Sequence, residues 1–171
     1  MSQNAQPARL VVVMGVAGSG KSSVGATLAG LMGGEFLDGD SYHPAANIEK
    51  MSRGAALTDD DRWPWLESLA RAMADRPGFV VGGCSALRRA YRDRIAATAG
   101  EPVLFVHLAG SKELIWQRMS ARKNHFMPVA LLDSQFATLE VPAADENALS
   151  VPITGSVEAI AADIARRLSP P

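Results

Sequence analysis

Short apolar runs alternate along the chain with segments whose apolar residues recur every three or four positions. The runs, of which the first is rich in valine, predict strands at 10–14, 35–38, 77–84, 102–108 and 148–153. The other segments predict helices at 22–32, 85–97, 111–123, 129–140 and 156–168, a short helix ending near Gly54, and another from Thr58 past Met73. Strands separated by helices are typical of a parallel sheet covered on both faces, so a three-layer α/β fold is expected.

The chain has 171 residues, which suits one domain over 9–171 preceded by a disordered tail at 1–8. Its net charge is −1, so the chain lacks the excess of positive charge that would favour nucleic acid or an anionic membrane as a partner. No apolar run approaches the roughly 20 residues of a membrane span. Cys84 is the only cysteine, which excludes an intrachain disulfide and favours a cytoplasmic location. Arg9 and the apolar run after it loosely resemble a signal peptide, an interpretation disfavoured because little positive charge precedes that run and Lys21 follows it.

A glycine-rich segment, GVAGSGKS at 15–22, lies between the first predicted strand and the first predicted helix. This spacing is that of a phosphate-binding loop, in which backbone N–H groups and a helix N-terminus surround phosphate oxygens. Lys21 would reach the β- and γ-phosphates, and the Ser22 hydroxyl would bind Mg²⁺. The alternative is a glycine turn with a solvated lysine. The predicted ATP-binding residues are Gly15, Val16, Ala17, Gly18, Ser19, Gly20, Lys21, Ser22 and Ser23.

Two aspartates follow the second predicted strand, and ligands of parallel sheets gather at the carboxyl ends of strands. Asp40 is therefore expected beside the phosphate loop, where it would accept a proton from an attacking hydroxyl or hold Mg²⁺. For Asp38, capping of the following turn is an equally good interpretation.

A dense polar segment comes next, with His43, Asn47, Lys50 and Arg53 followed by TDDDR at 58–62. Such a set suits a polyhydroxylated anion, because arginine binds carboxylates while amides and carboxylates bind hydroxyls. The alternative is a solvated helix start, which we favour for Asp59 and Asp60 but not for Arg62.

The segment CSALRRAYRDRI at 84–95 is expected to begin a helix at a Ser85 cap, with Arg88 one turn in and able to reach the cleft. Cys84 is expected to be a packed thiol, and His107 a core histidine inside a strand. The other arginines of this helix are expected to be surface charges: Arg89, Arg92 and Arg94.

The segment RMSARKNHFMP at 118–128 predicts a helix that breaks into a mobile lid, at about 118–130. Arg118 and Arg122 lie four residues apart, on one helix face. A lid arginine closing over the γ-phosphate would stabilise charge in the transition state and exclude water. Two surface arginines on an amphipathic helix are the alternative.

Several separated motifs resemble those of the gluconate kinases, a small phosphate-loop kinase family. They are MGVAGSGKS, FLDGDSYHPAANIEKMSRGAALTDDDRWPWL, CSALRRAYRD, RMSARKNHFM and SQFATLEVPAADE, which span 14–146. The resemblance implies a five-stranded parallel sheet, Mg-ATP as donor, D-gluconate as acceptor and a homodimer. It implies that Lys21, Asp40 and Arg122 are catalytic and that Arg118 binds ATP. The implied substrate-binding residues are Asp40, His43, Arg62, Arg88 and His125.

The sequence departs from that family at two places. Asn124 stands where the lid would carry a glycine, a change that asparagine tolerates because it adopts left-handed backbone more readily than most residues. Gly82 and Gly83 stand where larger apolar residues are expected, and we hypothesise that they let the ligand approach the strand closely. The segment 150–156 is expected beside adenine, by analogy of fold.

Two other functions compete with this one. A different small-molecule or nucleoside-monophosphate kinase would share the phosphate loop but not the response to gluconate. A nucleotide-gated interaction module would bind nucleotide without acceptor-dependent turnover. The polar set at Asp40, His43 and Arg62 disfavours the module. A guanine switch is disfavoured because the chain contains no N-K-x-D segment.

Overall fold

The structure is a computed structural model and describes residues 8–121 and 129–169. Its strands are β1 (Leu10–Met14), β2 (Glu35–Asp38), β3 (Val80–Gly83), β4 (Val103–Ala109) and β5 (Ala148–Pro152). Its helices are α1 (Lys21–Leu31), a 3-10 turn η1 (Gly39–Tyr42), α2 (Ala45–Ser52), α3 (Asp59–Ala74), α4 (Arg89–Ala99), α5 (Lys112–Ser120), α6 (Val129–Thr138) and α7 (Val157–Leu168). The predicted order of elements is confirmed. Among the described residues, no helix is long and apolar enough to cross a membrane.

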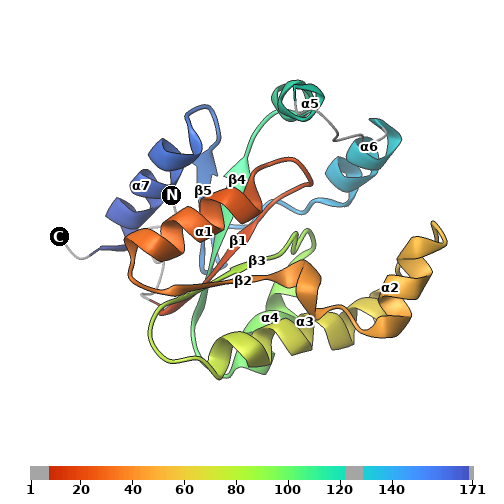
Figure 1. Ribbon diagram of the computed structural model, residues 1–171, viewed down its shortest axis with the longest axis horizontal. Coiled ribbons are helices and arrows are strands. Elements are labelled where there is room, and N and C mark those ends of the chain that lie inside the picture. Colours follow the sequence, from red (N-terminus) through yellow and green to blue (C-terminus); the bar gives the residue numbers. More distant parts are fainter. Residues whose placement is uncertain (1–7, 122–128, 170–171) are drawn as a thin grey trace.

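All five strands are parallel and lie in the order β2-β3-β1-β4-β5. In the central strand, Val13 pairs with Gly83 on one side and Val106 on the other. Helices α1 and α7 cover one face of the sheet, whereas α3 and α4 cover the other (Figure 1). The three-layer α/β prediction is confirmed, and the carboxyl ends of β1, β2 and β3 meet at one edge.

The core forms on both faces of β1 because every residue of that strand is buried. Val11 and Val13 pack toward α1 and α7, while Leu10, Val12 and Met14 pack toward α3 and α4. The helix predicted at 22–32 is confirmed as α1, which begins one residue earlier, at Lys21, and ends at Leu31. Leu31 does not join the apolar face of this helix, because it is 56% exposed. Of the predicted tail at 1–8, Ala8 packs against the core and the other residues lie outside the described ranges.

Helix α3 begins with a capping box, in which Thr58 and Asp61 accept each other's backbone N–H groups. The helix then runs through Pro64, which lies in the second turn, although a proline is tolerated best in the first turn of a helix. Its buried face is Trp65, Leu66, Leu69, Ala70 and Met73.

The two glycines at the end of β3 accommodate core side chains, so the hypothesis that they serve ligand approach is wrong. A Cβ on Gly82 would lie 2.6 Å from the Met73 sulfur, and one on Gly83 would lie 3.1 Å from the ring of Phe36. Gly82 therefore makes room for α3 on one face and Gly83 for Phe36.

Helix α4 begins four residues later than the sequence predicts, at Arg89, and the side chain of its N-cap, Arg88, makes no capping hydrogen bond to the helix. Ser85 is therefore not the cap. Residues 85–88 form a loop instead, in which Gly15 N–H donates to the Ser85 carbonyl and Glu140 N–H donates to the Leu87 carbonyl.

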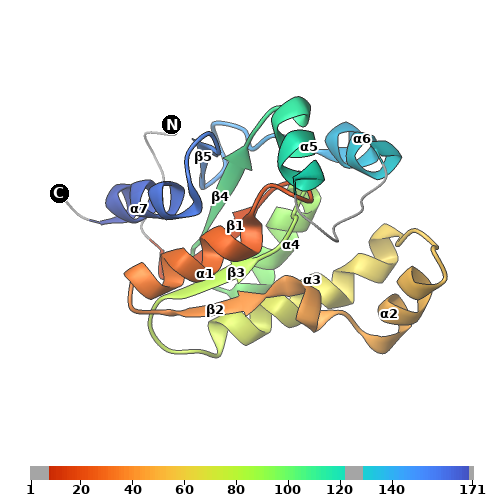
Figure 2. The same ribbon diagram turned by 45° about the horizontal axis from the view of Figure 1, so that its top comes forward.

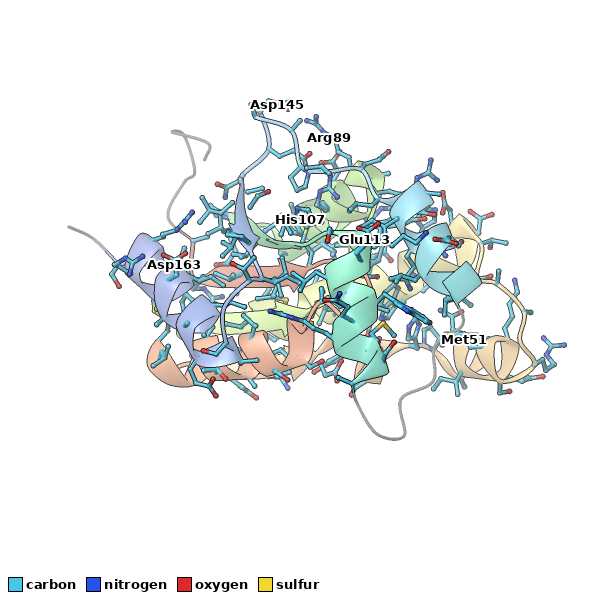
Figure 3. The ribbon with its side chains drawn as sticks, turned by 90° about the horizontal axis from the view of Figure 1, so that it is seen from above. Met51, Arg89, His107, Glu113, Asp145 and Asp163 are labelled. Atoms are coloured by element: carbon cyan, nitrogen blue, oxygen red, sulfur yellow. The ribbon has the colours of Figure 1, made fainter. Side chains whose placement is uncertain are left out.

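The surface position predicted for Arg92 is wrong, because its side chain is 1% exposed. The guanidinium donates to both carboxylate oxygens of Glu146, at 2.7 and 3.1 Å, and to the carbonyls of Ala86 and Glu140. Burial alone would raise the pKa of Glu146, but hydrogen bonds from Arg92 and from Ala143 N–H hold it below its usual value. By contrast, Arg89 is half-exposed and pairs with Asp145 at 2.8 Å (Figure 3).

Candidate active site

The glycine-rich loop connects β1 to α1 at the carboxyl edge of the sheet (Figure 2). Gly18 and Gly20 have φ of 81° and 96°, which favour glycine. A Cβ on Gly18 would lie 2.5 Å from the side chain of Met119, so this glycine also lets the loop pack beneath α5.

The loop has the donors that a phosphate requires. Within the residues described here, the backbone N–H groups of Gly18, Gly20, Lys21 and Ser22 have no hydrogen-bond partner. The last two belong to the first turn of α1, whose N-terminal dipole attracts anions. This geometry fits the predicted phosphate site.

Lys21 lies across the loop, and its Nζ donates to the Val16 carbonyl at 3.2 Å. Burial lowers the pKa of this ammonium, and the side chains of Cys84, Asp40 and Asp38 act in the opposite direction. Lys21 therefore shares one electrostatic environment with Asp38, the last residue of β2, and with Asp40, as the sequence predicts for Asp40.

The aspartates have different positions. The Asp38 carboxylate accepts the Asp40 N–H at 3.0 Å and caps η1, so the capping interpretation is confirmed for Asp38. The side chain of Asp40 is exposed at the sheet edge. Its turn is held in place at Gly39, whose carbonyl accepts Trp65 Nε1–H at 2.8 Å and whose Cα lies so close to β3 that a Cβ would be 2.3 Å from the Gly83 carbonyl.

His43 stacks on Trp65, with ring centroids 4.1 Å apart and an interplanar angle of 15°. Its Nδ1 lies 3.3 Å from Nδ2 of Asn47. Burial lowers the pKa of His43, Asp40 opposes this shift, and the positive charge of Arg62 adds to it. The same tryptophan thus positions both the η1 turn, which carries Asp40, and the imidazole.

Arg62 and Arg88 converge on one carboxylate, that of Asp59, each at 3.3 Å. Tyr91 donates its hydroxyl to the same carboxylate, and the Arg62 guanidinium carbon lies 5.4 Å from the centre of the Tyr91 ring. Asp59 does begin α3 and is 41% exposed, as predicted, but its carboxylate also joins α3 to α4, which the sequence did not predict. Asp60 is exposed, as expected. The result is a pair of arginines joined by Asp59, and the charge of one of them, Arg62, acts on His43.

Helices α5 and α6 lie side by side (Figure 2), joined by an ion pair between Lys112 and Asp133. Arg118, on α5, donates to the Gly155 carbonyl at 3.3 Å, which places it against the predicted adenine segment. Arg122 and His125 lie outside the described residues, as does the 122–128 part of the lid predicted at about 118–130. The ends of that predicted lid belong to the last turn of α5 and to the start of α6.

Two side chains set aside at the sequence level occupy core positions. Cys84 is 3% exposed, and burial raises the pKa of its thiol to about 12, so it is a packed thiol. His107 is 5% exposed, with Nδ1 3.4 Å from the Ser150 hydroxyl.

Two further residues contact the site: Gln135, for which the sequence predicts no role, and Asn47, which belongs to the polar set expected to bind the acceptor. Gln135 Oε1 accepts the Ala17 N–H of the phosphate loop at 2.6 Å. Asn47 contacts His43 and is 4% exposed, an unusual burial for asparagine. Gln135 lies within a motif that resembles a known family, and this resemblance was the only sequence signal pointing to it.

The fold and loop define a phosphate-loop α/β domain, and residues 10–142 match the family described as an AAA domain. A probable gluconokinase of Xenopus tropicalis is 43% identical, over 91% of this chain and 90% of its own length. The thermosensitive gluconokinase of Escherichia coli K12 is 49% identical, over 79% of this chain and 73% of its own. The crystal structure of a gluconokinase from Sinorhizobium meliloti 1021 has a TM-score of 0.84 at 45% identity, covering 93% of this chain and 90% of that one. The chain belongs to the gluconokinase family of kinases.

Proposed function

We propose that this protein transfers the γ-phosphoryl group of ATP to D-gluconate and forms 6-phosphogluconate. The observation that carries the proposal is a juxtaposition at one sheet edge. The charge of Asp40 acts both on Lys21 of the phosphate loop and on His43. Arg62, which also acts on His43, shares the carboxylate of Asp59 with Arg88. This juxtaposition supports a nucleotide phosphate site next to a site for an anionic polyol.

On the nucleotide side, the unpaired loop N–H groups and Lys21 would hold the phosphates, with Ser23 in the first turn of α1 and Arg118 nearer the adenine. The exposed Ser22 hydroxyl and the Asp40 carboxylate supply oxygen donors that suit Mg²⁺, which favours one or two protein oxygens together with phosphates. Bound Mg²⁺ neutralises charge on the transferring phosphoryl group.

On the acceptor side, Arg62 and Arg88 would bind the gluconate carboxylate, since a guanidinium matches a carboxylate in shape and charge. Asp40 would orient the attacking hydroxyl and accept its proton. Because phosphoryl transfer passes through a loose transition state, most of the catalysis is positioning and charge stabilisation. Arg122 and His125 of the lid are proposed to complete the site, and a homodimer in the cytoplasm remains a prediction.

The test is ADP production by the purified protein with Mg-ATP, alone and with D-gluconate, shikimate, glucose or AMP. Stimulation by gluconate alone is the expected result. A response to AMP or shikimate instead would contradict the acceptor and retain a kinase. Nucleotide binding with no stimulation by any acceptor would support the nucleotide-gated module.

A further inference from the structure

Asn47 is a buried amide whose Nδ2 lies between a backbone carbonyl and a histidine ring nitrogen. It lies in α2 and is 4% exposed. Its Nδ2 is 2.9 Å from the Asp61 backbone carbonyl at the start of α3, and 3.3 Å from Nδ1 of His43.

The Asp61 carbonyl determines which way this amide points. A carbonyl oxygen can only accept, so Asn47 must present its NH₂ group there, because the flipped amide would place two oxygens 2.9 Å apart. The second hydrogen of the same NH₂ group then faces His43. Nδ1 of His43 must therefore be an acceptor without a proton, which leaves the proton of the neutral ring on Nε2.

We propose that Asn47 is a positioning residue that holds His43 as the neutral Nε2–H tautomer, so that His43 donates a hydrogen bond to an oxygen of the sugar acid instead of removing a proton from it. The inference rests on the proposed function for the identity of the acceptor. Nε2 has no hydrogen-bond partner within the described ranges. Stacking on Trp65 fixes the ring plane, and Trp65 also anchors the turn that carries Asp40.

This arrangement divides two tasks between neighbours. Asp40 can accept a proton, whereas the fixed tautomer makes His43 a donor. Protonation of Nδ1 would set an N–H against the Asn47 NH₂ group, which disfavours the imidazolium. Of the charged side chains acting on this ring, Arg62 from α3 also disfavours the imidazolium, and Asp40 from η1 favours it.

The test is ¹⁵N nuclear magnetic resonance of the full-length protein labelled at histidine, without substrates. The chain has three histidines, so His43→Gln identifies the signal of interest. The wild type is expected to carry its proton on Nε2. Asn47→Asp places a carboxylate oxygen beside Nδ1, so the proton should move to Nδ1 and the pKa of His43 should rise by about one unit or more.

Two further variants separate positioning from folding. Asn147→Asp is the matched control, since Asn147 also donates to a backbone carbonyl, that of Val103 at 3.0 Å, and it should leave the His43 tautomer unchanged. Asn47→Ala, which removes the donor without adding charge, should give a mixture of tautomers. In Asn47→Asp, the KM for gluconate should rise about tenfold while the KM for ATP changes less than about twofold.

A wild-type ring protonated on Nδ1, or a tautomer that Asn47→Asp does not move, would overturn the inference. A shifted tautomer with an unchanged KM for gluconate would overturn the donor role. The tautomer is measured without substrate, so a wild type that lacks gluconate turnover would contradict the proposed function independently of that result.

Discussion

The side-chain oxygen of Gln135 accepts a hydrogen bond from the backbone N–H of Ala17 at 2.6 Å. Helix α6 thereby reaches into the phosphate loop. Two residues beyond the helix, Glu140 donates its N–H to the Leu87 carbonyl and accepts the Arg89 N–H. One short segment therefore connects the nucleotide loop to the start of α4, where Arg88 lies.

From this contact we expect Gln135→Met to tighten nucleotide binding about two- to tenfold, because the variant leaves the Ala17 N–H unpaired until a phosphate oxygen accepts it. Titration calorimetry with ADP and with a non-hydrolysable ATP analogue would measure the effect. Gln117→Met, at an exposed position on α5, is the control and should change nothing. Weaker binding in Gln135→Met would show that the glutamine supports the bound state instead.

Lys21→Ala should lower turnover by a factor of about a hundred or more, because it removes the only side-chain cation of the phosphate loop. The circular dichroism spectrum should stay native, since the lysine contributes one hydrogen bond to Val16. Lys112→Ala, which removes a half-exposed lysine on α5, serves as the comparison. Wild-type activity in Lys21→Ala would refute the phosphate-loop assignment.

Asp40→Asn should reduce kcat by a factor of about 10² to 10⁴ with little change in ATP affinity, if the carboxylate handles the acceptor hydroxyl. Steady-state kinetics with gluconate varied at saturating ATP would separate the two constants. Asp60→Asn offers an exposed carboxylate nearby and should behave as wild type. An unchanged kcat would remove Asp40 from the mechanism.

Arg92→Met should cost about 3–5 kcal/mol of unfolding free energy, because it leaves the Glu146 carboxylate buried without its partner. Urea denaturation would measure this loss. The double variant Arg92→Met with Glu146→Gln should recover part of it. Arg89→Met breaks only the exposed pair with Asp145 and should change stability by less than about 1 kcal/mol. Equal losses in the two single variants would contradict the buried ion pair.

The start of α3 should respond to acid. The Lys50 hydrogen bond, and then those from Thr58, lower the pKa of Asp61 from 3.8 to about 2. Since this pKa is lower in the folded state, the stabilisation is complete above the unfolded value of 3.8 and is lost as the pH falls through about 2. Asp61→Asn should therefore be less stable than wild type near neutral pH, and the difference should shrink at about pH 2. Urea midpoints at both pH values test this, and a constant difference would contradict it.

Local patterns were sufficient for the strands, the phosphate loop and the start of α3 near Thr58. A buried parallel strand needs a continuous apolar run, and the loop needs its glycines at fixed spacing, so both are visible in a few consecutive residues. The position of Asp40 followed from a general rule, that the ends of parallel strands meet at one edge.

Only the tertiary structure decided which charged side chains are buried or paired. Helix α4 starts four residues later than predicted, so Arg88 lies at the cap and not in the first turn. Residues 85–88 form a loop instead, because they contact the phosphate loop and Glu140. The partner that buries Arg92 is Glu146, which is distant in sequence. The role of Asp59 could not be assigned from sequence because it depends on how α3 packs against α4. The need for glycine at 82 and 83 depends on Met73 of α3 and Phe36 of β2, which pack against them. The order of residues along the chain determines the hydrophobic periodicity and the turns. Ion pairs and close packing, by contrast, depend on residues that only the fold brings together from distant segments.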